Sequence, residues 1–182
     1  MNVIFLDFDG VIDTIHNNSY DDIENKIKIL SDICKEYNCK VVISAAAKGA
    51  IDEETMKSES KWINYIFNLF KKYSIQCIGR TPNVKKIYSP SLYFEMWKDY
   101  EIILYLFRHP EIEHYCVLDD DDLAPNNSDL NKVRAHLLNT IYYSDNPKEE
   151  GLLEVHKDEI GNILQKENEI RKFALKRKDK IN

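Results

Sequence analysis

Residues 3–13 read VIFLDFDGVID, and this stretch decides which fold is expected of the whole chain. An uninterrupted apolar run is typical of a strand that is buried on both faces, as the strands of parallel sheets are. The run passes directly into Asp7 and then Asp9, and an unpaired carboxylate is costly inside a protein. Both side chains are therefore expected where the strand leaves the core, with Gly10 permitting a sharp turn.

Short apolar runs alternate with longer stretches of helical periodicity along the chain. The apolar runs are at 3–6, 40–44, 75–79 and 114–118, with a fifth expected within 135–143, and the helical stretches are at 23–37, 61–73, 99–110 and about 152–178. This alternation predicts βαβ units, and therefore an α/β fold with a mostly parallel central sheet. Ligands of such sheets bind at the carboxyl ends of the strands.

Length and composition favour a single ordinary globular domain. The chain has 182 residues, 43% of them hydrophobic, and a formal net charge of −6, which argues against a surface that binds nucleic acid everywhere. The basic segment 171–180 allows a local patch, although such charge runs are more often solvated helix ends. With neither a signal peptide nor a membrane span in the sequence, a cytoplasmic location is expected. The cysteines lack metal-binding spacing and are expected to be reduced: Cys34, Cys39, Cys77 and Cys116.

The pair Asp7 and Asp9 has the chemistry of phosphoryl transfer. One carboxylate can attack phosphorus and form an aspartyl-phosphate. The other can protonate the leaving oxygen and afterwards activate water. An Asp-rich turn without a catalytic role is the alternative, and the apolar lead-in and the Gly-Val exit count against it.

The run Asp119–Asp122 directly follows the fourth apolar run. Neighbouring carboxylates repel one another unless they are solvated or bind a cation, and hard oxygen ligands suit Mg²⁺. Asp119 and Asp120 are the expected ligands because they are closest to the strand end, whereas Asp121 and Asp122 are expected to face solvent. An acidic surface turn is the alternative.

Three further residues are candidates for contact with a phosphoryl group. Ser44 ends the second apolar run, where its hydroxyl can donate to a phosphoryl oxygen. Phosphoryl transfer also needs positive charge around the transferring oxygens. Lys48 and Lys98 are the candidates for that charge, and each is alternatively an exposed surface lysine.

The motifs FLDFDGVID, VVIS and VLDDDD, in this order, resemble those of the haloacid dehalogenase (HAD) superfamily of aspartate-nucleophile phosphohydrolases. The resemblance implies a three-layer Rossmann-like fold, Mg²⁺ dependence and phosphoryl transfer. It also implies that Asp7 is the nucleophile, Asp9 the general acid and base, and Ser44 the hydroxyl of the second motif. Asp119 and Asp120 match the acidic fourth motif, which holds Mg²⁺ together with Asp7 and the backbone carbonyl of Asp9.

Within the superfamily, the chain resembles the small HAD domains associated with RNA-repair (Swiss Army Knife) proteins. Those domains have Ser-Ser-x-Trp-Arg after the second strand and, later, a basic residue before Glu-Ile on a helix. Here residues 44–48 read SAAAK, so Ala47 stands in place of the tryptophan and Lys48 in place of the arginine. The stretch KDYEI at 98–102 keeps the basic residue and the Glu-Ile pair.

These observations predict a Mg²⁺-dependent phosphatase that works through an aspartyl-phosphate on Asp7. Few residues separate Asp13 from the first helix, so a capless or minimally capped single domain over 1–182 is expected. By analogy, an open site suits nucleic-acid ends or phosphoproteins, and nucleotides or small phosphoesters fit as well. The segment 81–97, a long loop or small insert, either stacks a base or packs into the core. The alternatives are a phospho-ligand-binding module with little turnover, suggested by SAAAK, and a phosphotransferase.

Overall fold

The first apolar run forms the middle strand of a five-stranded sheet. The computed structural model describes residues 1–84, 97–121 and 131–178. Its strands are β1 (Asn2–Leu6), β2 (Cys39–Ile43), β3 (Cys77–Arg80), β4 (His114–Asp119) and β5 (Leu137–Asn139). They are arranged in the order β3-β2-β1-β4-β5, and every neighbouring pair is parallel. The predicted α/β fold with a mostly parallel sheet is confirmed.

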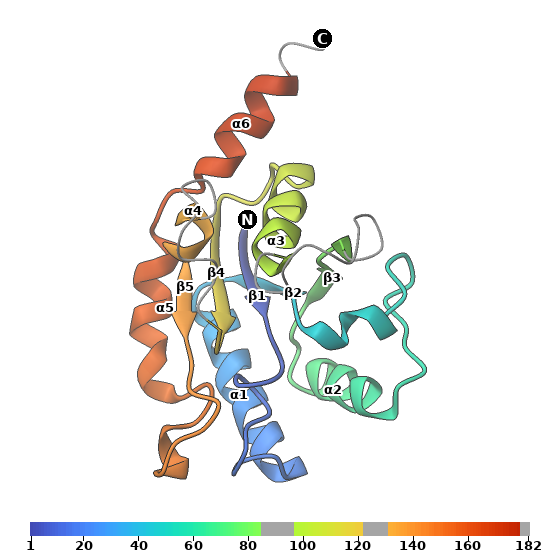
Figure 1. Ribbon diagram of the computed structural model, residues 1–182, viewed down its shortest axis with the longest axis vertical. Helices are drawn as coiled ribbons and strands as arrows, with labels where there is room; N and C mark the ends of the chain where they lie inside the picture. The colour runs from blue at the N-terminus through green and yellow to red at the C-terminus, as the bar shows by residue number, and fades with distance from the viewer. Residues whose placement is uncertain (85–96, 122–130, 179–182) are drawn as a thin grey trace.

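Helices cover both faces of this sheet and make three layers (Figure 1). The helices α1 (Tyr20–Glu36), α2 (Lys61–Lys72) and α5 (Lys157–Leu164) pack on one face, and α3 (Trp97–Arg108), α4 (Asn131–Arg134) and α6 (Glu169–Lys178) on the other. The described residues also form three short 3-10 helices: η1 (Ala46–Ala50), η4 (Pro147–Glu149) and η5 (Glu154–His156). Strand alternation divides the core accordingly, since Ile4 and Leu6 face α1 whereas Val3 and Phe5 face α3.

The first long helix, α1, begins at a capping signal in the sequence. The side chain of Ser19 accepts a hydrogen bond from the backbone N–H of Asp22, and the Asp22 carboxylate accepts one from the backbone N–H of Ser19. This capping box satisfies two amide groups that the first helical turn leaves unpaired. The apolar side chains then recur at helical spacing on the buried face: Ile23, Ile27, Leu30 and Ile33.

The C-terminal tail, expected to be helical from about 152 to 178, is divided into separate helices. The chain leaves the helical path between α5 and α6, and the buried residue Asn168 explains where α6 begins. Its side-chain oxygen accepts hydrogen bonds from the backbone N–H groups of Ile170 and Arg171, at 3.1 and 3.2 Å. Asn168 therefore acts as an N-cap. Figure 1 shows α6 extending away from the sheet toward the C-terminus.

Two of the predicted strands lie close to their expected positions, and the cysteines are free as predicted. The third strand begins at Cys77, two residues later than expected, and the fifth strand lies within the predicted range 135–143. All four cysteines are free, and three of them are buried: Cys34, Cys39 and Cys116. Within the described residues, no helix combines the length and the apolar character that crossing a membrane requires.

Candidate active site

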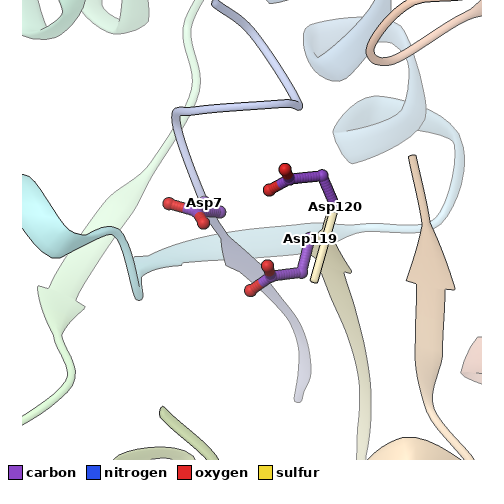
Figure 2. Close-up of side chains that lie close together, drawn as sticks. All are labelled: Asp7, Asp119 and Asp120. Atoms are coloured by element: carbon purple, nitrogen blue, oxygen red, sulfur yellow. The ribbon is translucent and has the colours of Figure 1, made fainter. Parts of the chain in front are cut away.

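Three carboxylates gather where β1 and β4 end side by side. The backbone N–H of Asp7 donates to the carbonyl of Leu118 at 3.0 Å, so Asp7 lies next to Asp119 at the carboxyl edge of the sheet. Asp120 follows directly, and carboxylate oxygens of the three residues all lie within 4.8 Å of one another. Figure 2 shows the three side chains close together at the ends of these two strands. The fold thus joins the first and the fourth sequence motifs.

Lys98, in the first turn of α3, places its ammonium group between two of these carboxylates. Its Nζ lies 2.6 Å from Oδ2 of Asp119 and also contacts Oδ2 of Asp7. Burial lowers the pKa of the amine, but the charges of Asp7 and Asp119 outweigh this effect and raise the pKa above its usual value. Lys98 therefore remains protonated and keeps a positive charge against Asp7.

The acidic residues at the end of β4 are held in surroundings that disfavour their charge. Burial raises the pKa of Asp119 to about 7, with Lys98 opposing the rise and Asp7 adding to it. Burial, together with the charge of Asp121, raises the pKa of Asp120 to about 6. Carboxylates crowded in this way are stabilised by a nearby cation. Since all the ligands are oxygens, Asp7, Asp119 and Asp120 fit a hard divalent ion such as Mg²⁺.

Gly10 makes room for this cluster. Its φ of +72° belongs to the left-handed region, as the predicted sharp turn requires. A Cβ atom at this position would lie 2.3 Å from the Cβ and Cγ atoms of Asp120. The turn is secured from β5, because the hydroxyl of Thr140 donates to the Gly10 carbonyl at 2.7 Å. Glycine is therefore needed here for close approach as well as for backbone conformation.

Asp9 stands apart from the three clustered carboxylates. Its side chain is exposed, and it does not belong to the group of oxygens that lie within 4.8 Å of one another. Partial desolvation, followed by the charge of Asp7, raises the pKa of the Asp9 carboxyl. A raised pKa suits a group that has to carry a proton. The role of Asp9 in proton transfer stays a prediction, and the metal contact that the resemblance implies concerns its backbone carbonyl.

Ser44 lies on the other side of Asp7, at the end of β2. Its backbone N–H donates to the carbonyl of Leu6 at 2.8 Å, which sets the two motifs side by side. The side chain is fully buried, and its hydroxyl has no hydrogen-bond partner among the described residues. A buried hydroxyl without a partner is unusual in proteins. Its place beside Asp7 agrees with the predicted donor to a phosphoryl oxygen.

Lys48 forms its ion pair with a residue of α3. Its side chain is buried in η1, and its Nζ lies 2.7 Å from Oε2 of Glu101 in α3. The other carboxylate oxygen of Glu101 accepts a hydrogen bond from the backbone N–H of Val84 at 3.0 Å. Glu101 therefore ties η1 and the segment after β3 to the helix that carries Lys98. Among the ion pairs of the described residues, Lys48 is paired with Glu101 and Lys98 with Asp7. The predicted role of Lys48 at a phosphoryl group stays a prediction.

Some features of the site could not be assigned from the sequence. Glu101 belonged to a recognised pattern, but its pairing with Lys48 follows from the packing of α3. Thr81 directly follows β3, and nothing in the sequence besides this place at a strand end indicated that it belongs to the site. Of the segment 81–97, residues 85–96 lie outside the described part of the chain. Whether this segment stacks a base or packs into the core therefore stays a prediction from the sequence. Asp121 is exposed as predicted, and Asp122 lies outside the described residues.

Comparison with known proteins gives one match. The family described as HAD domain in Swiss Army Knife RNA repair proteins matches residues 3–144. This range contains the clustered carboxylates, Ser44, Lys98 and the ion pair of Lys48 with Glu101. Searches of curated proteins and of solved structures gave no match.

Proposed function

Because the chain belongs to the family of HAD domains in Swiss Army Knife RNA repair proteins, we propose that it is a Mg²⁺-dependent phosphatase acting through an aspartyl-phosphate on Asp7. Membership of this family confirms the resemblance noted in the sequence and supports a phosphohydrolase type of function. The observation that carries the proposal is the placement of Asp7, a buried carboxylate that contacts Lys98 and lies within 4.8 Å of Asp119 and Asp120.

The nucleophile is held in position by two contacts. The backbone N–H of Phe8 donates to Oδ1 of Asp7 at 2.7 Å, and Lys98 contacts Oδ2. In the first step, an oxygen of Asp7 forms a bond to phosphorus while the bond from phosphorus to the leaving oxygen breaks. Asp9 gives its proton to that leaving oxygen, for which its raised pKa is suited.

The second step restores the enzyme. Asp9, now ionised, accepts a proton from a water molecule as the water oxygen attacks the phosphorus of the aspartyl-phosphate. The bond between phosphorus and Asp7 breaks, inorganic phosphate leaves, and Asp9 is again protonated. Ser44 donates to a phosphoryl oxygen in both steps, and the positive charge of Lys98 stabilises the charge that develops there.

Asp7, Asp119 and Asp120 are the side chains that would hold the metal ion. Bound there, Mg²⁺ supplies positive charge that neutralises the phosphoryl oxygens and orients the phosphate toward the nucleophile. Without the ion, only Lys98 balances these carboxylates among the ion pairs of the described residues. The excess of negative charge would repel a phosphorylated substrate, so activity is expected to depend on the metal.

A nucleic-acid end or a nucleotide is the substrate class that we favour. The family is described from RNA repair proteins, which supports this choice. The chain between Leu6 and Tyr20 contains no helix or named strand, so no cap domain is inserted after the first motif. A site without a cap at this position can accept a substrate that continues beyond the phosphate.

The decisive experiment is hydrolysis of p-nitrophenyl phosphate with Mg²⁺ and with a chelator. Turnover by the wild-type protein should require Mg²⁺, and Asp7→Asn should reduce it about 10³-fold or more because the nucleophile is lost. Asp32→Asn, which removes an exposed carboxylate of α1, serves as the matched control and should leave turnover unchanged. Circular dichroism would verify that both variants are folded.

Two results would contradict the proposal. One is metal-dependent turnover that survives in Asp7→Asn, which would mean another nucleophile. The other is tight binding of phosphate or nucleotides by the wild-type protein with no turnover of any phosphomonoester, which would favour the phospho-ligand-binding module.

A further inference from the structure

Polar side chains form a row across the carboxyl edge of the sheet. The register of β1 with β2 and β4 sets Ser44 on one side of Asp7 and Asp119 on the other. The backbone N–H of Thr81 donates to the carbonyl of Ile43, the residue before Ser44, at 2.9 Å. The row therefore continues by one strand beyond the proposed phosphoryl site, in the order Thr81, Ser44, Asp7 and Asp119.

The row lies on the face of the sheet that α3 covers. Phe5, Val42 and Val117 each precede a member of the row by two residues, and all three belong to the core beneath α3. Gly79 precedes Thr81 by two residues, and a Cβ atom there would lie 2.8 Å from the hydroxyl oxygen of Tyr105 in α3. Since strand side chains alternate between faces, Thr81 is on the same face as the nucleophile.

The hydroxyls of Ser44 and Thr81 share an unusual condition. Both side chains are 0% exposed, and neither hydroxyl has a hydrogen-bond partner among the described residues. Two polar groups that follow these residues in the chain, the Lys48 ammonium and the backbone N–H of Val84, both bond to Glu101. A buried hydroxyl without a partner costs stability, so its presence calls for a ligand that completes the hydrogen bond.

We infer that Thr81 is a substrate-contacting residue that donates a hydrogen bond to an acceptor oxygen on the leaving group. This inference rests on the proposed function. Neighbouring strands lie about 4.8 Å apart, so Thr81 is roughly 10 Å from Asp7 along the row, too far to share the phosphoryl group held by Asp7 and Ser44. The oxygen it meets is therefore a second one on the same substrate: a ribose hydroxyl or a second phosphate.

The test compares Thr81→Val, which keeps the shape of the side chain and removes the hydroxyl, with Thr81→Ser, which keeps the hydroxyl. The substrates are adenosine 3′-phosphate, 2′-deoxyadenosine 3′-phosphate, 2′-deoxyadenosine 3′,5′-bisphosphate and p-nitrophenyl phosphate. Thr81→Val should raise KM about fivefold to tenfold for the substrate that supplies the acceptor and leave KM for p-nitrophenyl phosphate unchanged. Thr81→Ser should keep most of the wild-type KM.

The substrate series identifies the source of the acceptor oxygen. If it is the 2′-hydroxyl of the ribose, only adenosine 3′-phosphate is affected by Thr81→Val, and if it is the 5′-hydroxyl, both 3′-monophosphates are affected and the bisphosphate is not. If it is a second phosphate, only the bisphosphate is affected. The inference is overturned if KM stays the same for all four substrates, or if it changes equally for all of them, p-nitrophenyl phosphate included.

A stability measurement separates a ligand contact from a structural role. Because the Thr81 hydroxyl has no partner among the residues that the structure describes, Thr81→Val should raise the melting temperature by about 2 to 4 °C while substrate affinity falls. A hydroxyl with a structural role would instead lower the melting temperature when removed, and this result would overturn the inference.

The inference can also be tested if the wild-type protein turns over no phosphomonoester, which is the failure of the proposed function. Titration calorimetry of the same three nucleotides then compares wild type with Thr81→Val. About fivefold weaker binding of one nucleotide class supports the contact, and equal affinities for all three overturn it.

Discussion

The two halves of the carboxyl edge of the sheet differ in how their charged groups are paired. In the acidic half, formed by Asp7, Asp119 and Asp120 at β1 and β4, Lys98 faces an excess of carboxylates. In the hydroxyl half, at β2 and β3, the charges of Lys48 and Glu101 match each other, and what is left over is a pair of hydroxyls without acceptors.

This difference indicates what each half would bind. The acidic half lacks positive charge, which a metal ion would supply, and the hydroxyl half lacks acceptor oxygens, which a phosphorylated substrate would supply. Within residues 1–84, 97–121 and 131–178, no protein group supplies what either half lacks. A metal ion and a phosphoester bound together would satisfy both, which is the combination that the proposed function requires.

Replacing each of the two lysines with methionine, one at a time, is expected to have the largest effects on stability and activity. Lys98→Met leaves Asp7 and Asp119 without their partner, so we expect a loss of about 3 kcal/mol in unfolding free energy with chelator present. Activity should fall about 10²- to 10³-fold because the charge at the phosphoryl group is lost. Added Mg²⁺ should restore part of the stability, since a cation replaces the missing charge. Urea unfolding with and without Mg²⁺ measures this effect.

Lys48→Met is the matched variant in the hydroxyl half. It should destabilise the protein by a similar amount, about 3 kcal/mol, because Glu101 is left buried without its partner. Mg²⁺ should not restore this stability, and activity should fall much less than in Lys98→Met. Equal loss of activity in the two variants would show that the lysines share a catalytic role and that the division into two halves is wrong.

Neutralising single carboxylates at the end of β4 sharpens the assignment of metal ligands. Asp120→Asn should raise the Mg²⁺ concentration for half-maximal activity about 10- to 100-fold, because a charged oxygen ligand is lost from the cluster. Asp121→Asn removes an exposed carboxylate one residue later and should change this value little. Metal titrations of activity compare the two variants. A larger effect of Asp121→Asn would mean that the metal ion is bound nearer the solvent, at Asp121.

Removing the hydroxyl beside the nucleophile tests the hydroxyl half. Ser44→Ala should lower kcat/KM for p-nitrophenyl phosphate about 10- to 100-fold, because a donor to the phosphoryl oxygens is lost. Stability should stay the same or rise, since the hydroxyl has no hydrogen-bond partner in the part of the chain that the structure describes. Steady-state kinetics and thermal unfolding measure the two quantities. A clear loss of stability with full activity would mean that Ser44 is structural.

Glu150 is a buried carboxylate outside both halves, and its substitution is expected to have the smallest effect of those considered. Its pKa is lowered, whereas the pKa of Asp119 is raised. Burial raises the pKa of Glu150, but hydrogen bonds from Ser144 and His16 outweigh it and lower the pKa to about 2. A lowered pKa in the folded state contributes stability above the unfolded value of 4.5, and this stability is lost as the pH falls toward 2. Glu150→Gln should therefore lower the melting temperature at pH 7 by about 2 to 4 °C.

The difference between wild type and Glu150→Gln should shrink between pH 4.5 and pH 2, as the wild-type carboxylate takes up its proton. Glu154→Gln, at an exposed position, is the control and should follow the wild-type curve. A difference in melting temperature that stays constant over this pH range would mean that the charge of Glu150 does not contribute.

Much of the fold could be predicted because burial and periodicity are local properties of a chain. A strand covered on both faces requires a continuous apolar run, and the first charged residue marks its end, which located Asp7 and Asp119 correctly. The edge strand β3 was placed two residues too early. Its pairing with β2 shifts register between Val41 and Val42, and an edge strand has one neighbour to determine its limits.

The partners of the charged and polar groups could not be predicted in the same way. From the sequence, Lys48 and Lys98 were equal candidates for the charge at the phosphoryl group. The packing of α3 separates them, because it brings Glu101 to Lys48 and Lys98 to Asp7. Thr81 likewise becomes distinct only when its neighbour Ser44 and its missing hydrogen bond are known.

The sequence by itself determined the order of the five strands along the chain, the strand ends that carry Asp7, Ser44 and Asp119, and the family. These follow from the pattern of apolar and charged residues within short segments. Only the tertiary structure decided which lysine contacts Asp7, why Gly10 must lack a side chain beside Asp120, and how the row of polar groups continues. Each of these depends on distances between segments far apart in the sequence, because the Coulomb and hydrogen-bond energies of a group depend on its neighbours in space.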